Sequence, residues 1–473
     1  MGEPMSTTGY RANGRLAKAR RRRLRPRAVC VILQALLVML PIADCESSRA
    51  ADPPTLSYDE ARALLKRVSD TLKAGEAVVD RSKDEVRAAR RLGWPDLSVN
   101  AIEMFGEKKG TIDGTPLGSI AFSENFRGPR SALDSTWSIY SGGRITATQR
   151  ALAAGVEAAN ADLANTEEDL DVLLAQVYFG LELAQSVEHT RRAALDQANR
   201  ELERAIQFER HGIIPKVERL SAQVARDEAA REEVAAERDR QIAEADLRRL
   251  LHSSEPIGTS TPLFVSTLPL KPLAEWLRDA QRESPTLARL ASRRNQAEQG
   301  VALAQSLWKP EIFAFGSYSL IHKYQTLIEP DWIAGVGVRF TLFSHEDRVS
   351  AVDAARQGLR AAQSLEDAGS IAIATRVESM YRKVEQAREQ FGLVESTISL
   401  AQENQRLRER GFAEGQATTL NVNEARNDLA QASTERALAA YDYDIALVQL
   451  LQAAGQAHSL PEYIRHADIR LSP

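Results

Sequence analysis

Cysteine is scarce in this 473-residue chain: only Cys30 and Cys45 occur, and both lie close to the N-terminus. Nearly all of the chain must therefore fold without disulfides or thiolate-bound metals. The seven histidines are scattered along the sequence, and no HxxxH or GxSxG pattern is present. These absences argue against an enzyme, and they predict neither a cofactor nor a metal site.

Long apolar runs are missing beyond residue 50, where no segment approaches the ~18 residues of a transmembrane helix. The mean hydropathy of −0.33 excludes a polytopic helical membrane protein. The formal net charge is −4 and becomes more negative without the basic N-terminus. The chain therefore lacks the basic surface that a nucleic-acid-binding protein needs. If the exported protein enters a membrane, we expect it to do so through β-strands.

Residues 1–50 are predicted to be a signal peptide that is removed from the mature protein. A basic segment over residues 18–27 precedes an apolar stretch over residues 28–42, and small residues then place cleavage after Ala50. Lipidation of Cys45 is an alternative, although the residue before it does not fit such a signal. A retained membrane anchor is less favoured, because the apolar stretch is short for a membrane span.

The dominant feature of the mature sequence is a predicted helix over residues 144–210. Apolar residues recur there every seven positions, at Val156, Leu163, Leu170 and Val177. This spacing is typical of a coiled-coil seam, and no proline interrupts the segment. A helix of this length is a rod of about 100 Å. Such a rod cannot bury its seam within a compact domain, so we expect other rods beside it.

The order helix, strand, strand, helix, helix occurs twice, which predicts an internal duplication. The first repeat, residues 51–256, is predicted to contain an initial helix, strands 96–106 and 131–141, and helices 144–210 and 216–251. The second repeat, residues 257–473, is predicted to contain an initial helix, strands 311–321 and 331–343, and helices 346–410 and 416–454. A loop rich in glycine and charge is expected over residues 107–130.

The four predicted strands alternate apolar and polar residues, and Trp137 and Trp332 suit a membrane interface. Four strands cannot close a membrane barrel, and an open edge in lipid leaves backbone groups unsatisfied. Several chains must therefore pool their strands, and three chains would make a 12-stranded barrel with a lumen. The predicted fold is mainly α with membrane β: a long coiled-coil helical barrel joined to a shared β-barrel.

Three segments in this architecture resemble a known family, the TolC-like outer membrane efflux proteins. They are the strand-to-helix junction at residues 139–144 and the hairpin turns at residues 211–220 and 412–425. The resemblance covers about residues 56–454. It implies a homotrimer in the cell outer membrane, with a helical tube in the periplasm. It also implies a passive exit duct of a tripartite efflux or type I secretion system, with a periplasmic adaptor and an inner-membrane transporter as partners.

The resemblance further implies a pore gate near the periplasmic end of the tube. The residues that match the acidic positions of the family are Glu218, Asn421 and Glu424, and Asn421 stands in place of the usual aspartate. A threefold axis would turn each into a ring that selects cations. Phe412 and Ala417 replace a tyrosine and an arginine of the family's closed-state latch. Solvated helix surface is the alternative interpretation of Glu218 and Glu424.

The resemblance places the two hairpin turns at the end that docks the adaptor. The candidate contact residues are Gly212 and Ile213 in the first turn and Gly415 and Gln416 in the second. Helix capping is the alternative role of both glycines.

A soluble periplasmic coiled-coil adaptor or scaffold without a barrel remains the main alternative for the whole chain. It would share the helical hairpins and lack the paired strands.

Overall fold

The computed structural model describes residues 55–471, except residues 117, 324, 326–328, 344–346 and 415. The predicted signal peptide, with cleavage after Ala50 and the alternative lipid site at Cys45, lies outside the described residues. Gly415, the second turn glycine, also lies outside them. No helix within the described part of the chain combines the length and apolar character needed to cross a membrane.

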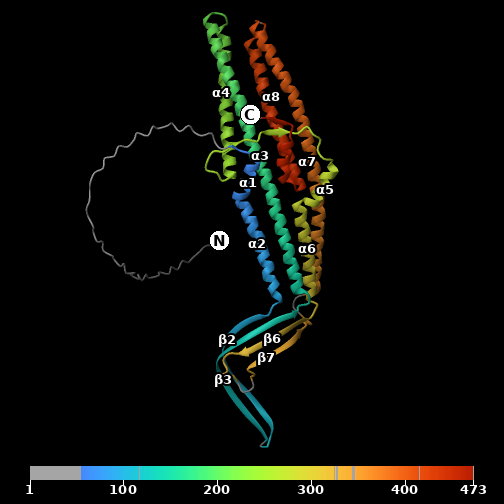
Figure 1. The fold of residues 1–473 in the computed structure, drawn as a ribbon. Helices are drawn as coiled ribbons and strands as arrows, with labels where there is room; N and C mark the ends of the chain where they lie inside the picture. Colours follow the sequence, from blue (N-terminus) through green and yellow to red (C-terminus); the bar gives the residue numbers. More distant parts are fainter. Residues whose placement is uncertain are drawn as a thin grey trace, which may run out of the picture. The chain divides into compact units, whose positions relative to one another are not determined.

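Two long helical hairpins dominate the structure (Figure 1). Helix α3 (Arg144–Arg210) and helix α4 (Lys216–Leu250) form the first hairpin, and α3 covers the range expected from its sequence. Helix α7 (Arg348–Ala413) and helix α8 (Thr419–Ala454) form the second hairpin. The hairpins pack against each other mainly through α3 and α8. The long rods therefore find the neighbours that their apolar seams require.

The initial helix of each repeat is broken into two, which differs from the single helix expected. In the first repeat α1 (Tyr58–Val68) ends at Ser69, whose side chain caps α2 (Asp70–Arg90). In the second repeat α5 (Leu273–Glu283) stops before α6 (Pro285–Ser306). Proline lacks a backbone N–H and disfavours helical geometry in the preceding residue. Pro285 therefore begins a new helix instead of lying inside one.

A compact layer around the middle of the helices, here called the equatorial layer, joins the two repeats. Its two small sheets were not expected from the sequence: β1 (Thr55–Leu56) with β4 (Gly258–Thr259), and β5 (Leu263–Val265) with β8 (Ile469–Leu471). The short elements η2 (Ala457–Ser459) and α9 (Leu460–His466) complete it. Large side chains are fully buried there: Tyr58, Tyr178, Phe179, Phe264, Trp276 and Tyr443. This layer is the hydrophobic core of the described chain.

Beyond the helices, four antiparallel strands form one sheet in the order β2–β3–β6–β7. Their bounds are β2 (Asp96–Thr115), β3 (Gly118–Tyr140), β6 (Glu311–Ser319) and β7 (Trp332–Arg339), and η1 (Arg91–Gly93) leads into β2. The prediction of a loop over residues 107–130 is wrong, because β2 and β3 stay paired as far as Thr115 and Gly118. Strands β2 and β7 form the two edges of the sheet and have no further neighbour in the described chain.

Candidate functional site

The two faces of the four-stranded sheet differ in polarity. One face carries apolar residues in aligned rows, all of them exposed except the half-buried Leu133 and Ala314: Leu97, Val99, Leu133, Trp137, Ala314, Tyr318, Trp332, Val336 and Val338. The opposite face carries polar groups, among which the amide of Asn100 donates to Asp134 at 2.6 Å. Apolar and polar residues on opposite faces are typical of a strand that has lipid on one side and water on the other.

Ile333 and two phenylalanines interrupt the polar face, and the phenylalanines pack onto glycines of the neighbouring strand. Phe315 lies over Gly335 and Phe313 over Gly337. A Cβ atom on Gly337 would collide with its ring at 2.7 Å, and one on Gly335 would be in tight contact at 3.1 Å. The guanidinium of Arg339 stacks on Phe313, 4.9 Å from the ring centre.

The two predicted interface tryptophans lie on the apolar face but not together. The indole N–H of Trp137 donates to the carbonyl of Gly93 at 2.8 Å, next to the helices. Trp332 begins β7, opposite Tyr318, and is 67% exposed. Val336, four positions farther along β7, shares a row with Trp137 through Ala314. At ~3.3 Å per residue the two indoles are about 13 Å apart along the strands.

The first hairpin turn has a capping glycine and an exposed apolar residue. Gly212 has a φ of +69°, and the N–H of Ile213 donates to the carbonyl of Phe208 at 2.8 Å. This is the geometry of a helix C-cap that requires glycine. Ile213 itself is 65% exposed. The capping role thus explains Gly212 alone, while Ile213 remains available to a partner.

The second turn is anchored by its backbone. The N–H groups of Gln416 and Ala417 donate to the carbonyl of Gly411 at 2.7 and 3.2 Å, which leaves the side chain of Gln416 exposed. The amide of Asn421 accepts hydrogen bonds from Thr418, whose hydroxyl in turn accepts the N–H of Asn421. This capping box begins α8. Asn421 therefore has a structural role that the sequence alone did not reveal.

The two acidic gate candidates lie on different hairpins. Glu218 is half-buried in the first turn of α4, and its N–H donates to the carbonyl of Pro215. Glu424 is exposed on α8. Within one chain they do not form a cluster, so any ring requires other copies.

A half-buried charge cluster lies between the hairpins close to the turns, and it could not be found from the sequence. Arg426 of α8 approaches Glu201 of α3 at 2.8 Å and Glu409 of α7 at 2.7 Å. The side chain of Arg426 is only 15% exposed. Burial raises the pKa of Glu409, but hydrogen bonds from Gln405 and Arg426 outweigh it and leave that pKa lowered. One guanidinium therefore connects three helices.

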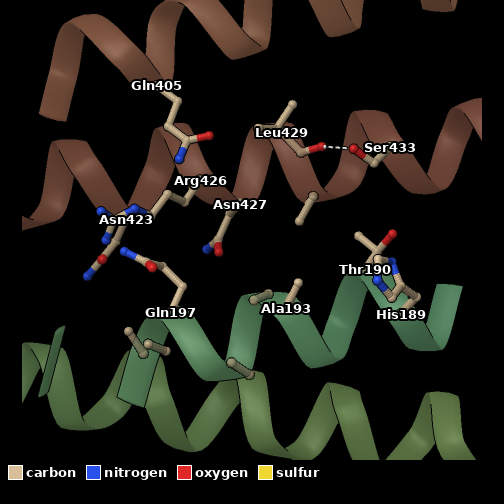
Figure 2. Close-up of a pocket in the computed structure, with 15 residues that line it drawn as sticks. His189, Thr190, Ala193, Gln197, Gln405, Asn423, Arg426, Asn427, Leu429 and Ser433 are labelled. Atoms are coloured by element: carbon tan, nitrogen blue, oxygen red, sulfur yellow. Dashed lines mark hydrogen bonds between the residues drawn. The ribbon is translucent and has the colours of Figure 1, made fainter. Parts of the chain in front are cut away.

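Two cavities flank this cluster. One, of about 360 Å³, lies between α3 and α8, where Gln197 points toward Asn423 and Asn427 (Figure 2). The other, of about 620 Å³, lies nearer the turns and is lined by Phe208, Ile213, Phe412 and Ala417 among others. Arg426 lines both cavities. The two hairpins are therefore loosely packed on either side of the charge cluster.

Buried carboxyl groups hold the equatorial layer against α3. Asp171 accepts two hydrogen bonds of 2.7 Å from Arg62 of α1. Glu168 accepts the N–H of Ala457 at 2.8 Å, and burial raises its pKa to about 7. Burial also raises the pKa of Glu182 to about 6.

Asp444, on α8, is fully buried and accepts the N–H of Phe264 at 3.3 Å, and burial raises its pKa well above the usual range. These carboxyl groups contribute to the packing of the equatorial layer. No group of three or more His, Cys, Asp or Glu in the described part of the chain could hold a metal.

Comparison with known proteins identifies a matching protein family and several solved structures with a similar fold. The sequence model described as "Outer membrane efflux protein" matches residues 63–252 and 276–456. No curated protein matches the chain by sequence.

Among solved structures, the CusC transmembrane channel has a TM-score of 0.72 at 13% identity, covering 84% of this chain and 91% of that one. The Campylobacter jejuni CmeC outer membrane channel has a TM-score of 0.68 at 14% identity, with 85% and 86% covered. The open Neisseria gonorrhoeae MtrE outer membrane channel has 0.67 at 17% identity, with 85% and 89% covered. At these identities the structures establish a shared fold.

Proposed function

The chain belongs to the outer membrane efflux protein family and is an outer membrane protein, and from that premise we propose that it is the exit duct of a tripartite efflux or type I secretion system. Three copies assemble around one axis, and their pooled strands form a 12-stranded barrel. The duct conducts substrate passively from an inner-membrane transporter, with a periplasmic adaptor at the hairpin turns. The division into repeats 51–256 and 257–473 is part of the same proposal.

The sheet β2–β3–β6–β7 is the observation that carries this proposal. Its two edge strands lack neighbours in the described chain, and one of its faces is apolar. At an open sheet edge in lipid, each unsatisfied backbone N–H or C=O group costs several kcal/mol of free energy. Pairing β2 of one copy with β7 of the next removes both edges at once. Because β3 leads through Gly142 and Gly143 directly into α3, the barrel and the helical tube share an axis.

The cluster at Arg426 supports a closed resting state of the tube. Arg426 binds one acid on each hairpin, Glu201 and Glu409, at the end where the cavities loosen the packing. Moving the hairpins apart breaks the contact with Glu201 first, since Glu409 belongs to the same hairpin as Arg426. This clamp substitutes for the polar latch whose positions Phe412 and Ala417 occupy. Glu218 and Glu424 are proposed to set the charge of the narrowed lumen.

The alternative of a soluble adaptor without a barrel is not supported. That alternative required helical hairpins without paired strands, whereas the described chain has a four-stranded sheet with an exposed apolar face.

The assembly can be tested by cross-linking its edges. With Val99→Cys in β2 and Val336→Cys in β7, a flexible bis-maleimide is expected to join copies into species of two and three chains on a denaturing gel. Val99→Cys alone is the control and should remain mostly single. Membrane extracts should also contain a heat-sensitive trimer. A single-chain species in the aqueous fraction, without cross-links, would contradict the proposed duct.

A further inference from the structure

The β2–β3 hairpin continues beyond the four-stranded part of the sheet as a two-stranded ribbon (Figure 1). Strand β3 pairs with β6 only from Ala132 to Tyr140, and the last bond on that side joins the N–H of Leu320 to the carbonyl of Ser131. Within the described chain, residues 118–130 therefore pair with β2 alone. At ~3.3 Å per residue the ribbon adds on the order of 40 Å, more than the ~25 Å apolar band of a membrane barrel.

The start of the ribbon is marked by a proline and a glycine, two residue types that are disfavoured inside a regular inner strand. Pro129 pairs with Glu103 and has no N–H to give to another strand, which is tolerated because β3 has lost β6 there. Gly128, beside it, has a φ of +155°. The backbone can therefore change direction where the sheet becomes a ribbon.

At this junction the two faces exchange polarity. The face that carries Val99 in the sheet continues in the ribbon with Glu103, Glu107 and Lys109. Glu107 accepts a hydrogen bond from Ser123 at 2.9 Å and pairs with Lys109 at 3.1 Å. Although Phe105 lies among these residues, the face is mainly polar. It is suited to water, not to lipid.

The opposite face of the ribbon becomes mainly apolar, although the register also places Arg130 opposite Ile102 and pairs Lys108 with Glu124 on it. It follows Ser98 and Asn100 of the sheet with Ile102 and Met104, and Ile120 lies farther along. Ile102 and Ile120 are 53% and 47% exposed in the single chain. This face continues the polar side of the sheet, which lines the lumen in the proposed barrel. The apolar face of the ribbon therefore turns toward the axis, above the membrane.

Resting on the proposed trimer, we propose that the ribbons of three copies meet through this face and form an apolar collar over the outer mouth of the duct. A soluble surface seldom leaves such a face uncovered. A threefold axis brings the same face of each copy to the same height, so each ribbon covers its neighbours. The collar narrows the exit on the side opposite to the hairpin turns.

Disulfide formation at the ribbon tests this contact. In a Cys30→Ser and Cys45→Ser background, Met104→Cys is expected to form at least about fivefold more interchain disulfide than Lys109→Cys, because a disulfide needs Cα atoms within ~7 Å. Lys109 is the matched control on the polar face of the same ribbon. Ile102→Cys provides a second inward position if Met104→Cys does not reach the membrane.

Each outcome is decisive. A heat-sensitive trimer with equal cross-linking at Met104→Cys and Lys109→Cys overturns the collar and leaves the duct intact. Absence of the trimer itself removes both proposals. Preferential cross-linking at Met104→Cys or Ile102→Cys within intact trimers supports the collar.

Discussion

The same two hairpins are packed in different ways along their length. At the equatorial layer, α3 and α8 bury Tyr178, Phe179 and Tyr443 in a dense aromatic core. Near the turns, the same helices enclose cavities of about 360 and 620 Å³ around Arg426. Dense apolar packing resists displacement, whereas a few ion pairs across cavities can be broken locally. The helices are therefore held more firmly at the equatorial layer than near the turns, which supports the opening proposed for that end of the tube.

The largest effect is expected from an aromatic truncation in the fixed region. Phe179 stacks on Tyr58 and touches Tyr178 and Phe264 edge-on. Phe179→Ala should lower the stability of the fold by about 3–5 kcal/mol through the cavity it leaves. The matched change near the turns, Phe208→Ala, should cost about 1 kcal/mol, because that ring is partly exposed beside a cavity. Guanidinium unfolding followed by circular dichroism measures the free energy of unfolding of both variants. Equal losses of stability would contradict the difference in packing between the two regions.

The next effect concerns opening of the tube end. Arg426→Met leaves the half-buried Glu201 without its interhairpin cation, at a cost of about 1–3 kcal/mol at that site. We expect higher single-channel conductance in planar bilayers with little change in the unfolding midpoint. Arg410→Met is the control, because Arg410 makes only an exposed pair with Glu414. An unchanged conductance for Arg426→Met would show that the cluster does not hold the tube closed.

A smaller effect should appear in the pH dependence of the equatorial layer. Burial raises the pKa of Glu168 from 4.5 to about 7, so the folded state binds a proton more tightly than the unfolded state. Stability contributed by this group is therefore present at low pH and is lost as pH rises from about 4.5 through 7. Glu168→Gln keeps an acceptor for the N–H of Ala457 and should flatten this dependence. Melting temperatures of both proteins at pH 5 and pH 8 test the difference, and parallel curves would contradict it.

The smallest effect is expected for ion selectivity. Glu218→Ala combined with Glu424→Ala should reduce cation preference in bilayer recordings and leave stability unchanged, since both residues lie near solvent. Glu228→Ala, an exposed change farther along α4, is the control. Identical selectivity in the double variant and the control would remove Glu218 and Glu424 from the gate.

The long helices could be predicted because their signal is local. Apolar residues repeat every seven positions and no proline interrupts α3, so Arg144–Arg210 follows from the sequence alone. The ribbon could not be predicted, because the glycines and charges of residues 107–130 are typical of loops. These residues form strands because β2 and β3 pair with each other, and a local sequence pattern does not show that pairing. The two- and three-residue strands β1, β4, β5 and β8 are too short to show any period.

The residues of the candidate site could be predicted only in part, because some of them come together only when the chain folds. Glu201, Glu409 and Arg426 lie on three helices, and only the packing of the hairpins brings them together. Asn421 matched an acidic family position, yet its amide is used to cap α8. Gly212 could be recognised as a helix end from its residue type. Its partner contacts, like those of Ile213 and Gln416, remain predictions.

The pairing of β5 with β8 has a consequence for the order in which the protein can fold. Residues 263–265 have no sheet partner until residues 469–471 have been synthesised and exported. Helical hairpins such as α3 and α4 can form early from contacts between neighbouring segments, whereas this closure spans most of the second repeat and carries a larger loop entropy. Partly exported chains therefore expose the aromatic core, and assembly of the proposed trimer must wait for the last strand of each copy.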